Sequence, residues 1–310
     1  MKQKYGLLLA LGIAGAAGIT GYSIPAAEYP APQVSYYEDE EEAPSPEVYD
    51  FHCGQDTVDI TSMLSVLEPY ADEPMGKLLC RAAELLEGRP YVANTLGYDD
   101  KALVINVHGL DCVTFVESCY ALANTARSGS GSWRDYARSI ENIRYRRGRR
   151  VDYASRLHYA TDWFGDNIYR GNITDITPTI ACHRSVLKTL DFMTKHPDSY
   201  PAFKDKEQLQ KCRDLEMGFR SMKIPYIPKS AAGEKAVVEA LEDGDMISFV
   251  SNKEGLDSSH VALLRKRDGK LYMMHASLKK GKVTFETAPL SDYFKYSKKD
   301  SPGFRVVRFK

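Results

Sequence analysis

The sequence predicts an α+β fold, because helical patterns fill the first two thirds of the chain and strand patterns fill the last third. Before Asp245, apolar residues mostly recur at helical spacing. After Asp245, short apolar runs are separated by turn signals such as Asp268-Gly269, which are typical of antiparallel hairpins. We therefore expect helices that pack on an antiparallel sheet in one domain, residues 51–310, which is long enough for an elaborated core.

The N-terminus has the composition of a signal peptide. Lys2 and Lys4 precede a run of small and apolar residues, and Ala26-Ala27 offers a cleavage site. The apolar run is too short and too rich in Gly and Ala for a membrane span, which needs roughly 20 apolar residues. We expect residues 1–27 to be removed, so that the mature chain has no stable membrane span and is exported from a bacterium, to the periplasm or the medium.

An acidic linker is expected over residues 28–50, which carry eight acidic residues, four prolines and no basic residue. This composition is typical of solvated, disordered chain. The whole sequence has a net charge of -1, and without leader and linker the remainder carries +5. A mildly basic body suits a small anionic substrate, and the excess is too small to indicate a nucleic-acid partner.

The remaining elements follow from apolar spacing and turn residues. Two helices are expected over 57–70 and 74–87, and two strands over 91–96 and 103–107. Further helices are expected over 111–127, 133–146, 183–195 and 205–221, and residues 156–167 hold an aromatic-rich segment. The strands of the last third are expected over 246–251, 260–266, 270–275, 282–287 and 304–309.

Cys112 is the strongest candidate nucleophile, because it lies where the loop Gly109-Leu110-Asp111 becomes a helix. The N–H groups and dipole at a helix N-terminus stabilise a thiolate, and the same N–H groups can hold an oxyanion. A lone cysteine on an amphipathic helix is usually a core residue, as we expect for Cys119. None of the six cysteines forms a CxxC pair, which argues against a zinc ribbon, and a Cys182–Cys212 disulfide stays open.

Two histidines supply a matching base. His260 begins one predicted strand and His275 ends the next, with the Asp268-Gly269 turn between them. A hairpin would bring both rings to the same end of the ribbon, so that one imidazole orients the other. Cys112, His260 and His275 would then form a Cys-His-His relay in which His260 takes the thiol proton and later protonates the leaving amine. Such a relay needs no metal and no cofactor.

Four segments occur in an order that resembles the NlpC-type papain-like cell-wall cysteine peptidases and amidases: DCVTFVE, GDMISFV (244–250), SHVALL and MHAS. Three more segments, YVANTL, LVINVHGLDCVTFVE and SRLHYATDW, resemble the N-acetylmuramoyl-L-alanine amidase-like branch, formerly a domain of unknown function. The resemblance implies a papain-like core. The sequence departs from the compact members of the superfamily in one respect, because 148 positions separate Cys112 from His260, and we expect a helical insertion there, about 128–232. The resemblance also implies cleavage between the lactyl group of N-acetylmuramic acid and L-alanine, with a preference for 1,6-anhydro-muropeptides.

Substrate contacts are predicted at two places. Tyr91, Thr95 and Asp111 lie close to the nucleophile in sequence, although strand packing is an alternative role for the first two. The second place is an aromatic-rich segment of the insertion, which forms either a sugar or peptide subsite or the core of the inserted helices: Arg156, His158, Tyr159, Asp162 and Trp163.

Three other functions stay open at this point. A stem-peptide endopeptidase, which cuts between D-glutamate and the diamino acid, would use the same relay with a different pocket. A non-catalytic muropeptide-binding module would not need a thiol beside imidazoles. A metal-dependent amidase would use His158, His183 or His260 as ligands. The sequence leaves open the stem-peptide length, the glycan end and the oligomeric state.

Overall fold

The computed structural model describes residues 45–296 and 301–310. The predicted signal peptide and most of the predicted linker lie outside these residues. The described part already starts with structure before residue 51, because strand β1 (Tyr49–Phe51) pairs in parallel with β2 (Leu103–Ile105). The folded body therefore includes the last residues of the segment that we expected to be a linker.

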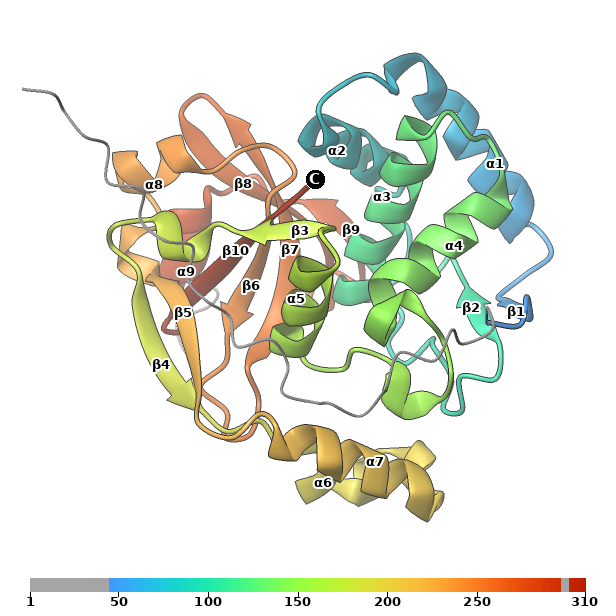
Figure 1. Cartoon of the computed structure of the whole chain (residues 1–310). Coiled ribbons are helices and arrows are strands. Elements are labelled where there is room, and N and C mark those ends of the chain that lie inside the picture. The colour runs from blue at the N-terminus through green and yellow to red at the C-terminus, as the bar shows by residue number, and fades with distance from the viewer. Residues whose placement is uncertain (1–44, 297–300) are drawn as a thin grey trace, which may run out of the picture.

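Four helices form one side of the molecule (Figure 1), and their bounds are α1 Asp56–Leu67, α2 Met75–Leu85, α3 Cys112–Arg127 and α4 Trp133–Arg144. These helices were predicted from apolar spacing, and their ends agree with the prediction to within a few residues. Helix α3 is the most buried of the four, with an almost unbroken run of buried residues from Thr114 to Ala123. It packs against α1, α2 and α4 on one side and against the sheet on the other. The helix of Cys112 is therefore packed between the other helices and the sheet.

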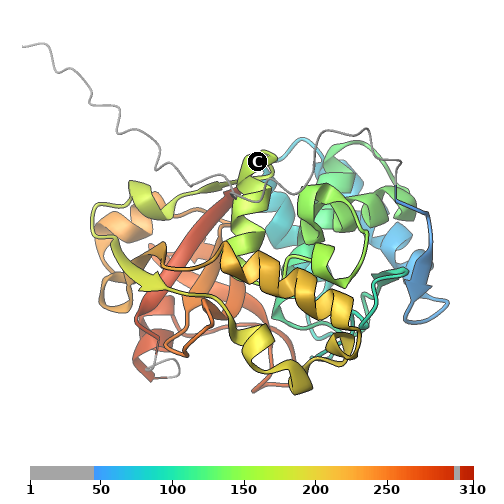
Figure 2. The same ribbon diagram turned by 60° about the horizontal axis from the view of Figure 1, so that its bottom comes forward.

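An antiparallel sheet forms the other side of the molecule, and the two sides adjoin in both views (Figures 1 and 2). Its C-terminal strands are β6 Met246–Val250, β7 Ser258–Arg267, β8 Lys270–Ser277, β9 Lys282–Phe285 and β10 Gly303–Phe309. Arg267 pairs with Lys270 across Asp268 and Gly269, both of which have positive φ. The tight hairpin predicted there is confirmed.

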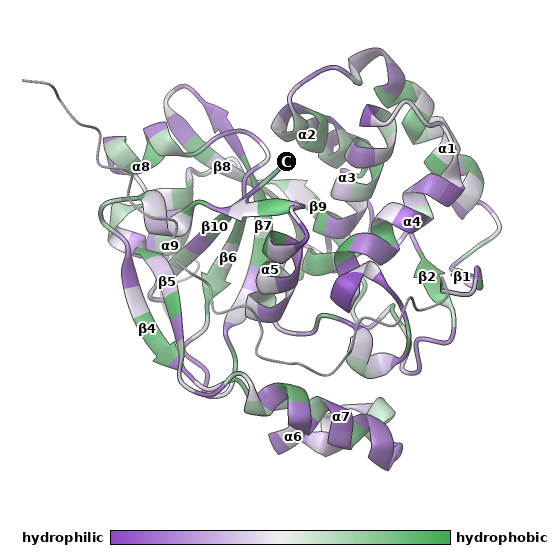
Figure 3. Cartoon of the chain, viewed as in Figure 1, coloured by the Kyte–Doolittle hydropathy of each residue, from purple (hydrophilic) through white to green (hydrophobic). Residues whose placement is uncertain are grey.

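The insertion between α3 and β7 contains strands as well as helices. Besides α4, its α-helices are α5 Ala160–Tyr169, α6 Phe192–Lys195 and α7 Lys206–Met217, and its strands are β3 Ile173–Asp175, β4 Arg184–Lys188 and β5 Met222–Pro228. Strands β3 and β5 both pair with β10, so the inserted segment extends the main sheet. The prediction of a purely helical insertion over about 128–232 is wrong in this respect. Helix α7 lies at one end of the molecule and is largely hydrophilic (Figure 3).

Two further predictions are wrong in secondary structure. Residues 91–96 form no strand, because Asn94 and Gly97 adopt positive φ and interrupt the extended chain; only Tyr91 forms a bridge, to Leu110. Residues 183–195 form β4 and the short α6 instead of one helix. Strand β4 lies at the edge of the sheet and pairs only with β5, which is more than 30 residues away in sequence. Such a long-range pairing leaves no local signal.

Two short helices, α8 (Lys235–Ala240) and α9 (Leu290–Tyr296), pack on the sheet through a second apolar core. The six cysteines are all free, and Cys182 and Cys212 belong to different cores, so the disulfide left open by the sequence is not formed. Among the described residues, no helix combines the length and the apolar character that crossing a bilayer requires.

Candidate active site

Cys112 is the first residue of α3, and Asp111 caps the helix in front of it. One carboxylate oxygen of Asp111 accepts hydrogen bonds from the backbone N–H groups of Val113 at 3.0 Å and Thr114 at 2.8 Å. In return the Thr114 hydroxyl oxygen accepts from the Asp111 N–H at 2.9 Å, which completes a capping box. Asp111 was predicted to contact substrate, but its carboxylate is engaged in fixing the start of the helix that carries Cys112.

Cys112 is half-buried at the start of α3, and this helix packs against β7, the strand that carries His260. The backbone N–H of Val261, which directly follows His260, is among the groups that lower the pKa of the thiol. Burial raises the pKa of Cys112 to about 12, and the Asp111 carboxylate adds to this, while nearby backbone N–H groups oppose it. The N–H groups at the helix start favour the thiolate, as expected, but burial outweighs them, so the resting sulfur is a thiol and needs a base.

His260 and His275 are in direct contact. The Nε2 atom of His260 lies 2.6 Å from the Nδ1 atom of His275, and the two rings cross at 78°. His260 is half-buried and stacks on Phe249, whereas His275 is only 1% exposed. The pairing of two imidazoles across the β7–β8 hairpin, predicted from turn and strand spacing, is present in the structure.

The other ring nitrogen of His275 contacts the carboxylate of Glu286, a residue that the sequence did not predict to belong to the site. The Nε2 atom of His275 lies 2.9 Å from Oε1 of Glu286, and the Lys280 ammonium donates to Oε2 of Glu286 at 2.8 Å. Burial alone would raise the pKa of Glu286, but hydrogen bonds from Lys280 and His275 outweigh it and hold that pKa below its usual value. For His275, burial lowers the pKa and outweighs the opposite effect of the Glu286 carboxylate. The ring is therefore neutral near pH 7.

Tyr91 belongs to the same cluster. Its backbone N–H donates to the Gly281 carbonyl at 2.9 Å, which fastens it to the turn between β8 and β9. Burial raises the pKa of Tyr91 to about 12, with further contributions from Cys112 and Asp111. Thr95 follows on an irregular loop, and within the described part of the chain its hydroxyl oxygen is buried without a hydrogen-bond partner.

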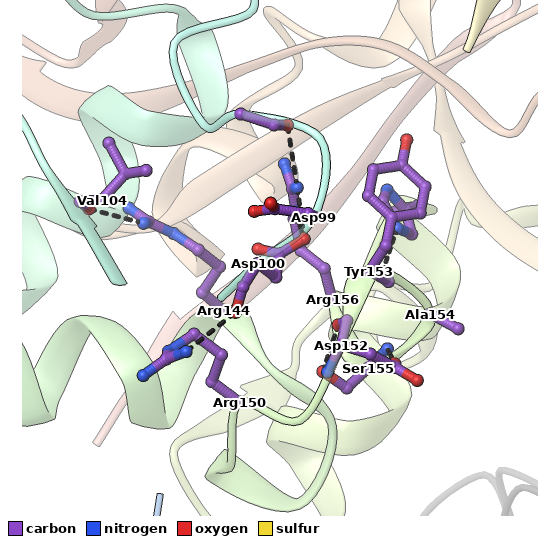
Figure 4. Close-up of polar contacts among 12 residues, drawn as sticks. Asp99, Asp100, Val104, Arg144, Arg150, Asp152, Tyr153, Ala154, Ser155 and Arg156 are labelled. Atoms are coloured by element: carbon purple, nitrogen blue, oxygen red, sulfur yellow. Dashed lines mark hydrogen bonds and ion pairs between the residues drawn. The ribbon is translucent and has the colours of Figure 1, made fainter. Parts of the chain in front are cut away.

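Arg156 contacts this loop through Asp100 (Figure 4). Its guanidinium binds the carboxylate of Asp100 at 2.5 Å and the carbonyl of Gly97 at 3.1 Å. The Asp100 side chain is fully buried and also accepts from the Tyr145 hydroxyl at 2.6 Å, while Arg150 donates to its backbone carbonyl. Arg156 was a candidate substrate residue, and these contacts indicate instead that it holds the 91–100 loop in place.

The other candidates of the insertion are also engaged in packing. His158 Nε2 donates to the Tyr153 carbonyl at 2.8 Å, and the Tyr159 hydroxyl donates to Glu216 at 2.7 Å. Asp162 forms a buried ion pair with Arg146 at 2.6 Å. Trp163 is 3% exposed and belongs to the main core. These partners correspond to the core-packing alternative for the segment and not to a sugar subsite.

A second cluster of polar side chains includes His108, the residue just before the nucleophile loop. Ligand atoms of Cys53, Asp56 and His108 all lie within 4.8 Å of one another, a spacing that could hold a metal ion; among the described residues this grouping does not include His158, His183 or His260. However, the Arg89 guanidinium lies 2.9 Å from Nδ1 of His108 and can only donate. The His108 proton is therefore on Nε2, whereas a metal-bound histidine needs a bare nitrogen there and an acceptor behind it. The contacts indicate a hydrogen-bonded support for the loop.

A cavity of about 570 Å³ lies elsewhere, between the start of α2, the turn before β6 and the end of β10. Its lining includes Arg127, the last residue of α3, whereas Cys112 is the first. At 1.5 Å per residue, the two ends of this helix are roughly 22 Å apart. The cavity is therefore separate from the cluster around Cys112.

The mixed α+β architecture with its antiparallel sheet is that of solved amidases. A family model described as AmiA-like, N-acetylmuramoyl-L-alanine amidase-like, matches residues 81–303, and the chain belongs to this family. An N-acetylmuramoyl-L-alanine amidase from Bacteroides uniformis shares 31% identity with a TM-score of 0.70, over 76% of this chain and 99% of the other.

Two further solved structures are similar. A Bacteroides fragilis protein described as a candidate xylanase shares 32% identity with a TM-score of 0.68, over 74% of this chain and 99% of the other. A Legionella pneumophila protein of the DUF1460 family shares 21% identity with a TM-score of 0.64, over 82% of this chain and 94% of the other, and supports the fold alone. No curated protein matches the chain in sequence.

Proposed function

We propose that the chain hydrolyses the amide bond between N-acetylmuramic acid and L-alanine in peptidoglycan fragments, with a preference for 1,6-anhydro-muropeptides, and that Cys112 is the nucleophile. Family membership supports the reaction class. The observation that carries the catalytic assignment is that Cys112 starts helix α3, which packs on β7, the strand from which His260 begins the His260–His275–Glu286 line. A papain-like arrangement of the core and export of the mature chain belong to the same proposal.

The chemistry follows from the resting thiol. As the sulfur attacks the lactyl carbonyl carbon, the thiol proton passes to Nδ1 of His260, the nitrogen that does not face His275. Asp111 occupies the N–H groups of Val113 and Thr114, so the oxyanion donor at the helix start is the N–H of Cys112 itself. The Tyr91 hydroxyl is the second donor in this proposal, because Tyr91 and Cys112 pack against the same core.

The tetrahedral intermediate then collapses. The C–N bond breaks, His260 returns its proton to the leaving amine of L-alanine, and a muramoyl thioester stays on Cys112. Water, deprotonated by His260, attacks the thioester carbonyl and releases the acid and the free thiol. The balance requires only water, and no redox partner.

The composition of the cluster argues against glycoside hydrolysis, the activity that the Bacteroides fragilis description suggests for that protein. Most glycosidases act through two carboxyl groups that flank the scissile bond. Here the nearest carboxylates are already engaged: Asp111 caps α3, and Glu286 binds His275 and Lys280. A thiol beside an imidazole instead suits acyl transfer.

The test is digestion of defined muropeptides, with and without the anhydro sugar, followed by mass spectrometry. An amidase releases a peptide that begins with L-alanine, whereas an endopeptidase leaves L-alanine and D-glutamate on the sugar. Cys112→Ala and His260→Ala should abolish cleavage, and Cys182→Ala, a half-buried cysteine on another core, should keep wild-type turnover. Wild-type turnover by Cys112→Ala would remove the assignment.

A further inference from the structure

Glu286 is joined to the catalytic base by an unbroken line of hydrogen bonds. From Glu286 Oε1 the line runs to Nε2 of His275 at 2.9 Å, and from Nδ1 of His275 to Nε2 of His260 at 2.6 Å. Each ring nitrogen along this line can be either a donor or an acceptor, depending on the tautomer. An ionised carboxylate can only accept, so the Glu286 end decides the direction of every bond in the line.

The direction follows step by step. His275 must carry its proton on Nε2 to donate to Glu286, and the neutral ring therefore has a bare Nδ1. That bare nitrogen must accept, so Nε2 of His260 carries the proton that is donated to it. In a neutral His260 ring, Nδ1 then has no proton and can accept one from a thiol.

We infer that Glu286 is a positioning residue that fixes the proton positions of His275 and His260, so that His260 presents a bare Nδ1 to Cys112. The inference rests on the proposed function for its purpose, but its geometry stands independently. Glu286 itself touches neither the sulfur nor, in this account, the substrate. It acts through two imidazoles, as the buried aspartate of a serine protease triad acts through one.

Lys280 defines the environment of Glu286. Its ammonium binds Oε2 and leaves Oε1 to His275, so each carboxylate oxygen has one donor. The other titratable group that faces this site is Tyr293 of α9, whose ring lies 6.1 Å from that of His275. The Glu286 backbone N–H donates to the Met273 carbonyl at 2.8 Å, which holds the residue beside β8 whatever its side chain. A near-isosteric replacement should therefore fold.

The substitution Glu286→Gln gives a sharp test, because glutamine has one acceptor and one donor where glutamate has two acceptors. Lys280 can only donate, so it claims the amide oxygen and turns the amide NH₂ toward His275. Nε2 of His275 must then accept, and every bond in the line reverses. His260 is left with its proton on Nδ1, the nitrogen that would have to take the thiol proton.

A second variant separates this effect from simple loss of packing. In the double variant Lys280→Met/Glu286→Gln, nothing competes for the amide oxygen, so the amide can rotate and accept from His275 again. Lys280→Met alone should change little, because Glu286 still accepts from His275. Recovery of activity on adding a second substitution is not expected from a merely structural role.

The experiment measures the ring nitrogens of ¹⁵N-histidine-labelled protein by NMR, together with the rate of Cys112 alkylation by iodoacetamide. Peptide mass spectrometry resolves the six cysteines, and Cys182 serves as the internal reference. We expect Nε2 protonation of His260 and His275 in the wild type and Nδ1 protonation in Glu286→Gln. Alkylation of Cys112 near pH 7.5 should slow at least about tenfold in Glu286→Gln, because the thiolate forms only with a base, and should recover in the double variant.

Unchanged tautomers in Glu286→Gln, or a double variant as slow as the single one, would overturn the inference. Neither readout uses a muropeptide. If the tautomers and alkylation respond as expected while no muropeptide is cleaved, the inference about Glu286 holds and the proposed function fails.

Discussion

The pH dependence of stability should depend measurably on His158, through a mechanism unrelated to substrate. Burial lowers the pKa of His158 from its usual 6.5 to about 3, with a further contribution from the nearby Arg156 guanidinium. The unfolded chain therefore binds a proton at His158 more readily than the folded protein does between these two values. The stability that the neutral His158 contributes is fully present above pH 6.5 and is lost as the pH falls from 6.5 toward 3.

The magnitude follows from the two pKa values. At pH 5 the unfolded state gains about 2 kcal/mol from protonating His158, since each pH unit below the unfolded pKa contributes about 1.4 kcal/mol. At pH 4 the same effect reaches about 3.4 kcal/mol. These are large fractions of a typical total stability of about 5–15 kcal/mol.

The assay is urea unfolding of wild type and His158→Gln at pH 7.5 and pH 5. Glutamine keeps a donor for the Tyr153 carbonyl but does not titrate. The free energy of unfolding of His158→Gln should therefore fall by about 2 kcal/mol less than that of the wild type on acidification. Carboxyl groups with raised pKa values, such as Asp100 and Asp162, titrate in both proteins and cancel in the comparison. Parallel losses in the two proteins would refute the reasoning, and a raised KM at pH 7.5 would return His158 to the substrate site.

Three further substitutions test structural roles. Arg156→Met should cost about 3–5 kcal/mol in urea unfolding, because it leaves the Asp100 carboxylate buried without its cation; a change only in KM would contradict this. Gly76→Ala should lower the free energy of unfolding by about 1–3 kcal/mol, since the added Cβ would lie 1.9 Å from the Asp243 carbonyl oxygen. Wild-type thermal stability of this variant would contradict the tight contact. Trp163→Ala should cost about 3–5 kcal/mol through a core cavity, with an unchanged KM in the fraction that stays folded; an altered KM would place it in the site.

The centre of the site could be predicted because its signals are local. The apolar spacing of residues 111–127 predicts a helix that starts at or beside Cys112, and the Asp268-Gly269 turn fixes the register that brings His260 toward His275. Both are short-range patterns, so one sequence is enough to apply them. The α+β class follows in the same way from the switch between helical and strand periodicity.

Glu286 could not be found by the same means. Its contact with His275 depends on how β9 pairs with β8 and on the hydrogen bond that ties its backbone to Met273. No motif marks such a residue, because many glutamates follow short strands. The sequence signal that could have indicated Glu286 is a carboxylate two strands after the strand of His260.

The insertion was predicted least well, for two physical reasons. Its strands β3 and β5 are stabilised by pairing with β10, more than 70 residues later in the chain, and this tertiary contact overrides local propensity. The side chains of Arg156 and Trp163 have the chemistry of a sugar-binding surface, yet the first binds buried Asp100 and the second packs in the core. Residue type alone does not reveal which way a side chain faces.

The most direct test of the central claim is the mass of the covalent intermediate. The purified protein is mixed with an anhydro-muropeptide, quenched with acid within one turnover, and digested for peptide mass spectrometry. Amide cleavage by Cys112 predicts a muramoyl group, without any amino acid of the stem, as a thioester on the peptide that contains Cys112. An adduct that also carries L-alanine and D-glutamate would contradict the amidase assignment, and turnover without any adduct on Cys112 would contradict the nucleophile itself.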